Sequence, residues 1–255
     1  MITYKIYSNI GNREVNEDSV GEQQKDENYL FILADGLGGH GHGECASNLA
    51  VTTSSEMFHG EYFQGKNEKE FLAQCFDCAQ DIITMSQKET REYADMKTTM
   101  VLLLISGNRA YWGHIGDSRL YYFKKNKMIT RTLDHSVPQM LVNTGEIKEK
   151  DIRGHEDRSR LLRVVGSPWM NGHAYDISEG IDLNKSQVFL LCSDGFWEQI
   201  TEKEMMQCLK KADTVDAWLD RMVEIVNENG KGSDMDNNSA IAVWVEPELS
   251  LIHIS

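Results

Sequence analysis

The chain has few basic residues and no long apolar run. Its 26 Lys and Arg stand against 40 Asp and Glu, which gives a formal net charge of −14 over 255 residues. A nucleic acid or an anionic membrane surface would require a basic footprint, so we expect neither as a partner. The longest aliphatic run, Met100 to Ile105, is far shorter than the roughly 20 apolar residues that span a bilayer.

Cysteine is also scarce, and its placement argues against a disulfide framework. The five cysteines are dispersed along the chain at Cys45, Cys75, Cys78, Cys192 and Cys208. Their odd number predicts reduced thiols in a cytoplasmic protein. Cys75 and Cys78 form a C-x-x-C inside a helical pattern with no second pair, so we expect core residues there. The first residues lack the charged-then-apolar pattern of a signal peptide.

Against these absences stands one chemically dense stretch, Tyr29 to Ser47. The apolar run from Tyr29 to Ala34 predicts a buried strand, and it ends in Asp35. A turn rich in glycine follows, and a helical pattern begins at Glu44. Glycine lets a backbone approach a cation closely, and carboxylate and carbonyl oxygens are the ligands of hard metal ions.

Hydrophobic periodicity predicts a chain of mixed α and β structure. Strands are expected at residues 2–8, 29–34, 100–105, 110–115, 120–123, 128–133, 188–192 and 239–246. Helices are expected at residues 44–58, 67–92, 137–142, 201–211 and 214–229. Asn67 and Thr201 are the predicted caps, each with a glutamate three residues on. Short turns between residues 100 and 133 predict four antiparallel neighbours in a meander.

Four aspartates lie where an apolar strand starts or stops: Asp35, Asp117, Asp194 and Asp236. Each has a glycine or an asparagine close beside it. If the strands direct them to a common edge, their carboxylates repel one another unless cations lie between them. Ligation by oxygen alone favours Mg²⁺ or Mn²⁺ over zinc.

Two polar segments have both a structural and a functional interpretation. Residues 11–19 form a turn-rich loop with Arg13, Glu17 and Asp18, either merely solvated or able to grip a phosphate and serve a metal's outer shell. Residues 137–172 include an irregular insertion with several arginines. These arginines either meet an acidic or phosphorylated partner or simply balance a very acidic protein.

Several motif matches fail on chemical grounds. Residues 36–41 satisfy G-x-G-x-x-G, but Asp35 at the head of the loop has the wrong charge for a pyrophosphate, which argues against a nucleotide-binding oxidoreductase. The loop contains no lysine and so is not a Walker A motif. An EF-hand starting at Asp234 would lack its glycine and its bidentate glutamate. His40 and His42 lie too close together to resemble a zinc site.

Taken in order, the motifs resemble the type 2C family of metal-dependent protein serine/threonine phosphatases over residues 4 to 246. The motifs are R-x-x-N-E-D at 13–18, A-D-G-x-G-G-H at 34–40, G-E-x-A-S at 43–47, T-T at 98–99, G-D-S-R at 116–119, D-H-S at 134–136, S-D-G at 193–195 and D-N-x-S at 236–239. The resemblance implies an α+β fold, a four-layer α-β-β-α sandwich of two antiparallel sheets flanked by helices. It implies one phosphatase domain at residues 1–247, with a flap-like insertion at 137–172 and a tail at 248–255.

The resemblance also implies roles for individual residues. Asp35 bridges two Mn²⁺ or Mg²⁺ ions, the Gly36 carbonyl binds one of them, and Asp194 and Asp236 hold the other side. Glu17 and Asp18 act mainly through bound water, and Arg13 grips the phosphate. Asp117 matches the position of a third, weaker metal. The implied partners are phosphorylated proteins, including a separate serine/threonine kinase and its substrates.

The sequence departs from the family at Leu37, where some members have a histidine proposed as general acid. We therefore expect metal-bound water to protonate the leaving group. The expected activity is hydrolysis of phosphoserine and phosphothreonine by a water that bridges two metals. One alternative is a pseudophosphatase acting as a binding module, which would be expected to lack metal aspartates that this chain retains. Another is a related phosphatase of regulatory switch proteins.

Overall fold

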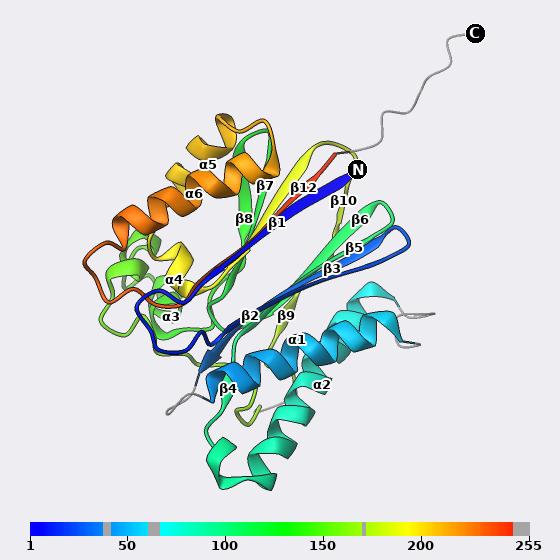
Figure 1. Ribbon diagram of the computed structural model, residues 1–255, viewed down its shortest axis with the longest axis vertical. Coiled ribbons are helices and arrows are strands. Elements are labelled where there is room, and N and C mark those ends of the chain that lie inside the picture. Colours follow the sequence, from blue (N-terminus) through cyan, green and yellow to red (C-terminus); the bar gives the residue numbers. More distant parts are fainter. Residues whose placement is uncertain (38–41, 61–66, 170–171, 247–255) are drawn as a thin grey trace.

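Two antiparallel sheets packed face to face form the centre of the molecule, with helices covering both outer faces (Figure 1). The computed structural model describes residues 1–37, 42–60, 67–169 and 172–246. The expected tail at 248–255 and the glycine-loop residues 38–41, including His40, lie outside this part. The expected four-layer α+β sandwich is confirmed.

The first sheet has the strand order β1-β12-β11-β7-β8. Its strands are β1 (Ile2–Asn9), β7 (Arg119–Lys124), β8 (Lys127–Arg131), β11 (Gln187–Cys192) and β12 (Asn238–Val245). The helices on its outer face are α5 (Glu202–Lys210) and α6 (Val215–Asn229). Trp218, Leu219 and Met222 of α6 are buried in the apolar cluster between these helices and the sheet.

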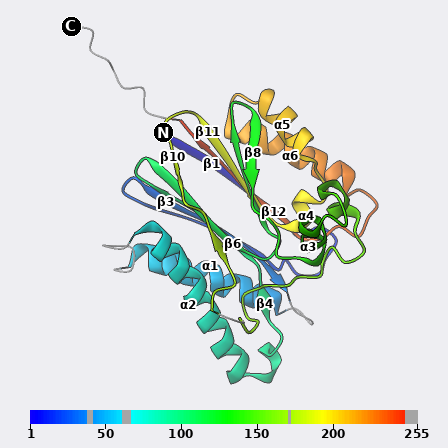
Figure 2. The same ribbon diagram turned by 180° about the vertical axis from the view of Figure 1, so that it is seen from behind.

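The second sheet has the order β10-β6-β5-β3-β2, with β4 paired to β3 and β9 paired to β6. Its strands are β2 (Asp18–Lys25), β3 (Asn28–Leu37), β4 (Lys97–Thr98), β5 (Met100–Ser106), β6 (Arg109–Ile115), β9 (Asp176–Ile177) and β10 (Ile181–Asp182). Helices α1 (Gly43–His59) and α2 (Glu68–Glu89) cover its outer face, as both views show (Figure 2). A short 3-10 helix, η1 (Arg91–Tyr93), follows α2.

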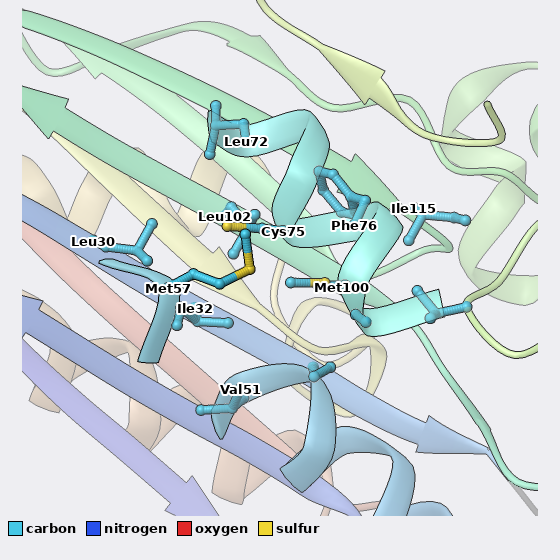
Figure 3. Close-up of a cluster of buried hydrophobic side chains, with 14 of the residues drawn as sticks. Leu30, Ile32, Val51, Met57, Leu72, Cys75, Phe76, Met100, Leu102 and Ile115 are labelled. Atoms are coloured by element: carbon cyan, nitrogen blue, oxygen red, sulfur yellow. The ribbon is translucent and has the colours of Figure 1, made fainter. Parts of the chain in front are cut away.

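Strand β3 is apolar throughout its centre because both of its faces are buried. Leu30 and Ile32 point into the cluster under α1 and α2, beside Met57 and Cys75 (Figure 3). Phe31 and Leu33 belong to the cluster between the two sheets. Successive side chains of a strand point to opposite faces, so a strand between two cores needs an unbroken apolar run. Cys75 is confirmed as a core residue, and none of the five cysteines, all of which lie among the described residues, forms a disulfide.

The predicted four-stranded meander is wrong at its middle turn. Strands β5 and β6 pair in one sheet and β7 and β8 in the other, so the turn at 116–118 carries the chain between sheets. Gly116 has a φ of +97°, and a Cβ there would lie 2.6 Å from Thr99 Cγ2. Apolar alternation could not show this change, since both hairpins have the same pattern.

The remaining elements gather at the end of the sandwich where the aspartates lie. They are α3 (Val137–Thr144), η2 (Glu149–Gly154) and α4 (Asp194–Trp197). Helix α3 ends at Gly145, which has a φ of +80° as its left-handed cap requires. Strands β2, β4, β9 and β10 and helix α4 were not predicted, because each is short or lacks a regular apolar pattern.

Candidate active site

The predicted metal residues begin with a direct cross-strand pair. Asp18 of β2 lies opposite Asp35 of β3 in the antiparallel register, so both side chains lie on the same face. The loop predicted over residues 11–19 therefore ends earlier than expected, and Asp18 is a buried strand residue. Strand β3 also continues past Asp35 to Leu37, where it pairs with β4.

The two threonines of the T-T motif hold the backbone of Asp35. The Asp35 amide donates to Thr99 Oγ1 at 3.1 Å, and the Thr99 amide donates back to the Asp35 carbonyl at 2.8 Å. Thr98 Oγ1 donates to the same carbonyl at 2.9 Å. The Thr99 hydroxyl also lies 2.7 Å from the Ser118 hydroxyl, next to Asp117. Asp35 is therefore positioned by hydrogen bonds to its backbone, and its carboxylate interacts with that of Asp194.

Gly36 lies where three backbone segments converge. Its amide donates to the Glu17 carbonyl at 3.0 Å, and the Gly43 amide donates to Glu17 Oε1 at 3.1 Å. A Cβ on Gly36 would lie 2.1 Å from the Gly43 carbonyl oxygen. Only glycine fits there, and the contact places Glu17 beside Asp35 and the start of α1.

Asp194 and Asp236 come from the other sheet. Asp194 is the first residue of α4, directly after β11, and Asp236 lies two residues before β12. Ser193 Oγ donates to Asp18 Oδ2 at 2.8 Å and accepts from the Ser239 amide at 3.0 Å. These bonds connect the metal residues of the two sheets at one end of the sandwich.

Asn237 organises the loop that carries Arg13 and Glu17. Its Nδ2 donates to the carbonyls of Ile10 and Val15 at 2.8 and 3.0 Å, and its Oδ1 accepts from the Glu17 amide at 2.8 Å. The sequence placed Asn237 and Ser193 inside recognisable motifs but assigned them no role. Their position beside an aspartate in each motif was the available signal.

The carboxylates raise one another's pKa values. Burial raises the pKa of Asp35 well above its usual range, and the charges of Asp194, Asp18, Asp117 and Asp236 raise it further. Burial, followed by the charge of Asp236, also raises the pKa of Asp194. The pKa of Asp18 is raised to about 7, again chiefly by burial, although bonds from Ser239 and Ser193 oppose the shift.

The donor set fits divalent cations. The gathered side-chain ligands are all carboxylate oxygens, which hard ions such as Mg²⁺ and Mn²⁺ prefer. Asp18 Oδ1 is buried and has no hydrogen-bond partner, so one ligand atom lacks the compensation that a buried polar group normally has. A bound cation would supply that compensation and remove the mutual repulsion.

An open cleft of about 590 Å³ lies over these groups. Its lining includes Arg13, Glu17, Asp35, Gly36, Leu37, Ser159, Asp194 and Asp236. Arg13 forms two bonds to Asp236, Nε to Oδ1 and an Nη to Oδ2, both at 2.9 Å. The cleft thus brings together every predicted site residue except Asp18 and Asp117, which lie beneath it, 7% and 4% exposed.

Asp117 lies in the turn between the sheets, with a network of charges and aromatic rings behind it. Its carbonyl accepts from Trp197 Nε1 at 3.0 Å, and the Arg119 guanidinium lies 3.4 Å from the centre of the Trp197 ring. Arg119 also forms a buried bidentate pair with Asp134 at 2.6 and 2.8 Å. The G-D-S-R and D-H-S motifs therefore meet in one structural unit.

A second group of potential metal ligands, His114, His135 and Asp176, is satisfied by hydrogen bonds. His135 Nδ1 accepts from the Gly116 amide, so its proton is on Nε2, which faces Asp176 at 3.2 Å. His114 Nε2 faces the Leu133 carbonyl and must donate to it. The two rings stack at 4.7 Å with an interplanar angle of 16°, so their lone pairs do not converge on one ion.

Comparison with known proteins agrees with this geometry. The profile of the protein phosphatase 2C family matches residues 7–244. The serine/threonine phosphatase stp of Listeria innocua is 31% identical over 233 residues, which cover 86% of each chain. The Mycobacterium tuberculosis serine/threonine phosphatase PstP/Ppp superposes with a TM-score of 0.84 at 27% identity, covering 96% of this chain and 99% of that one.

A structure of the catalytic domain of PstP in complex with two manganese ions also matches, with a TM-score of 0.81, 25% identity, and coverage of 96% of this chain and 98% of that one. The fold and the site thus define a metal-dependent phosphoric monoester hydrolase. The chain belongs to the protein phosphatase 2C family. The antiparallel sheets exclude the nucleotide-binding oxidoreductase, which requires parallel strands.

Proposed function

We propose that this chain dephosphorylates phosphoserine and phosphothreonine in proteins at a dinuclear Mn²⁺ or Mg²⁺ site. The observation that carries the proposal is the convergence of Asp18, Asp35, Asp194 and Asp236 from both sheets beside a cleft that contains Arg13. The family match and the two-manganese relative support the same assignment.

Asp35 and the Gly36 carbonyl would hold metal on the side of β3, and Asp194 and Asp236 on the side of the other sheet. Glu17 and Asp18 would act mainly through water, and Asp117 would serve a third, weaker ion. The bound ions supply Lewis acidity and lower the pKa of a water molecule. Because ions compete with protons for the carboxylates, metal binding would depend on pH.

The chain's own residues bind and orient the phosphate group. The Arg13 guanidinium lines the cleft and can pair with two phosphate oxygens, as it now pairs with two oxygens of Asp236. Leu37 offers no proton to a leaving group from its place in the cleft lining. Cys75 and Cys192 are fully buried, and burial raises the pKa of both thiols, so neither is a nucleophile.

We infer that residues 1–247 form one phosphatase domain with a flap-like insertion at 137–172. The family match over residues 7–244 supports this extent. Among the described residues, no helix has both the length and the apolar character needed to cross a membrane. We further propose a cytoplasmic protein that opposes a separate serine/threonine kinase.

The test is hydrolysis of a phosphothreonine peptide with Mn²⁺, with and without chelator, in the wild type and in Asp194→Ala. We expect activity that chelation removes and that the substitution lowers by at least about 100-fold, since it deletes a ligand. Asp213→Ala, at an exposed position between α5 and α6, is the matched control. Activity that survives both chelation and Asp194→Ala would refute the mechanism. Phosphopeptide binding without hydrolysis would favour a binding module.

A further inference from the structure

One surface segment is basic although the molecule as a whole is acidic. The sequence from Arg158 to Arg163, R-S-R-L-L-R, carries three arginines in a protein whose net charge is −14. No aspartate or glutamate follows until Asp176. A local basic segment on an acidic protein is a feature that composition alone does not explain.

This segment forms part of the rim of the catalytic cleft. Ser159 lines the cleft together with Asp35 and Asp194, so Arg158 and Arg160 flank a residue that faces the site. Arg158 pairs with Glu198 at 3.1 Å. The Glu198 amide donates to the Asp194 carbonyl at 2.9 Å, which places this contact one helical turn from a predicted metal ligand.

The backbone of the segment is held in place by the elements beside it. The Arg160 amide donates to the Asp157 carbonyl at 2.9 Å, and the Arg160 carbonyl accepts from the Val137 amide at 2.9 Å. The Leu162 amide donates to the His135 carbonyl at 2.7 Å. These bonds fix where the arginine side chains start, which lowers the entropic cost of binding a ligand there.

Unlike Arg158, whose Nε bonds to Glu198, Arg160 and Arg163 make no side-chain hydrogen bond with the described residues. The side chain of Arg160 is 71% exposed, and its ion-pair partner Asp157 is 3.9 Å away. The side chain of Arg163 is 50% exposed, with Asp176 at 4.0 Å. Both separations exceed hydrogen-bond length, so the guanidinium groups can still donate to an incoming carboxylate.

The Arg13 loop contributes two carboxylates to the cleft lining against one guanidinium. Glu14 and Glu17 line the cleft there. A peptide segment with acidic residues would be repelled by Glu14 and Glu17 and attracted to Arg160 and Arg163. The charges around the cleft therefore favour substrates whose acidic residues lie on the side of Arg160 and Arg163.

We propose that Arg160 and Arg163 form a subsite for aspartate and glutamate side chains next to the phosphorylated residue, so that the enzyme selects phosphoproteins with acidic flanking sequence. This inference rests on the proposed phosphatase function and names its substrate class. The subsite orients the substrate peptide and favours its encounter with the cleft, whereas Arg13 and the metal residues act on the phosphate group itself.

The experiment compares three phosphothreonine peptides of equal length whose flanking positions carry Glu, Gln or Lys. With Mn²⁺ at low salt, we expect kcat/KM for the Glu peptide to exceed that for the Gln peptide by about threefold to tenfold, the size expected for exposed ion pairs. The Lys peptide should be the poorest substrate. The preference should shrink in high salt, because exposed charges are screened.

In the double variant Arg160→Gln/Arg163→Gln, the ratio of kcat/KM for the Glu peptide to that for the Gln peptide should fall to near one. The double variant Arg160→Lys/Arg163→Lys should keep part of the wild-type preference. Arg221→Gln, at an exposed position on α6, removes a positive charge far from the rim and should keep the wild-type ratio. Equal kcat/KM for the Glu and Gln peptides in the wild type, or a ratio unchanged in the double variant, would overturn the inference alone. If no peptide is hydrolysed with Mn²⁺, the proposed function itself fails.

Discussion

Arg13 and Asp236, 223 residues apart, form a bidentate ion pair on the wall of the cleft. One residue is the predicted phosphate ligand, and the other is a predicted metal ligand. Hydrogen bonding to Asp236 raises the pKa of Arg13 further above its ordinary value. Because one guanidinium cannot fully serve a carboxylate and a phosphate together, phosphate binding by Arg13 would weaken this pair.

Arg13→Ala should lower kcat/KM for a phosphopeptide by about 10-fold to 100-fold, the cost of losing hydrogen bonds to a charged group. Apparent Mn²⁺ affinity should stay the same or improve, since Arg13 no longer competes with the metal for Asp236. The kcat/KM of Arg13→Lys should lie between those of the wild type and Arg13→Ala, because an ammonium cannot pair in a bidentate manner. Steady-state kinetics over a Mn²⁺ titration measure both effects, with Arg109→Ala as a distant control. Unchanged kcat/KM with weaker metal binding would assign Arg13 a structural role only.

Gly36→Ala should remove activity and destabilise the protein. The new Cβ would lie 2.1 Å from the Gly43 carbonyl oxygen and 2.8 Å from that of Glu17, and both are backbone atoms that cannot move cheaply. Gly154→Ala is the matched control, because nothing lies within 4 Å of its added Cβ. Thermal unfolding and Mn²⁺-dependent hydrolysis report the two effects. A Gly36→Ala protein as active and as stable as Gly154→Ala would contradict the packing argument.

The Asp134 carboxylate should matter far more to stability than a surface carboxylate does. Asp134→Asn removes the bidentate charged partner of Arg119, whose side chain is 2% exposed, and leaves only Glu202 at 3.9 Å. We expect a loss of about 3–5 kcal/mol. Glu228→Gln breaks an exposed pair with Lys231 and should change stability by less than about 0.5 kcal/mol. Urea unfolding in chelator separates this effect from metal binding. Equal losses in the two variants would show that burial of the pair is energetically unimportant.

His114 should make the protein sensitive to acid. Burial is the main reason that its pKa falls to about 4, whereas an unfolded histidine titrates near 6.5. Between these values the unfolded chain takes up a proton that the folded protein does not, so stability falls as pH drops from about 6.5 to 4. The shift corresponds to about 3 kcal/mol.

His114→Gln keeps a donor for the Leu133 carbonyl but does not titrate. We therefore expect a flatter dependence of unfolding free energy on pH between 6.5 and 4. His173→Gln, whose side chain is 70% exposed in the wild type, is the control and should keep the wild-type slope. Denaturant unfolding at several pH values supplies the comparison. An unchanged slope in His114→Gln would mean that another group causes the acid sensitivity.

Local interactions explain what could be predicted well. Asn67 Oδ1 accepts from the Glu70 amide at 2.9 Å, and Thr201 and Glu204 form the expected capping box. Both signals depend on residues three positions apart, so no tertiary information is needed. The placement of Asp35 and Asp194 at the ends of buried strands could be predicted for the same reason, since each apolar run and the aspartate that follows it are close together in the sequence.

Non-local pairing explains what was missed. The pattern from residue 100 to residue 133 showed four strands but not that the second and third lie in different sheets. The polar strand β2 has no regular apolar pattern, so the sequence predicts a loop at Asp18. Its place is decided by pairing with β3 and by the bond from Ser193, 175 residues away.

The sequence by itself determined the longer helices, the caps at Asn67 and Thr201, the main apolar strands, the family and the set of carboxylates that can bind metal. These follow from contiguous residues and from motif order. The tertiary structure alone decided which sheet each hairpin joins, that Asp18 faces Asp35, that Arg13 holds Asp236, and that Ser159 brings a basic segment to the cleft rim. The physical reason is that each of these contacts joins segments far apart in the chain, whose pairing depends on how the two sheets pack.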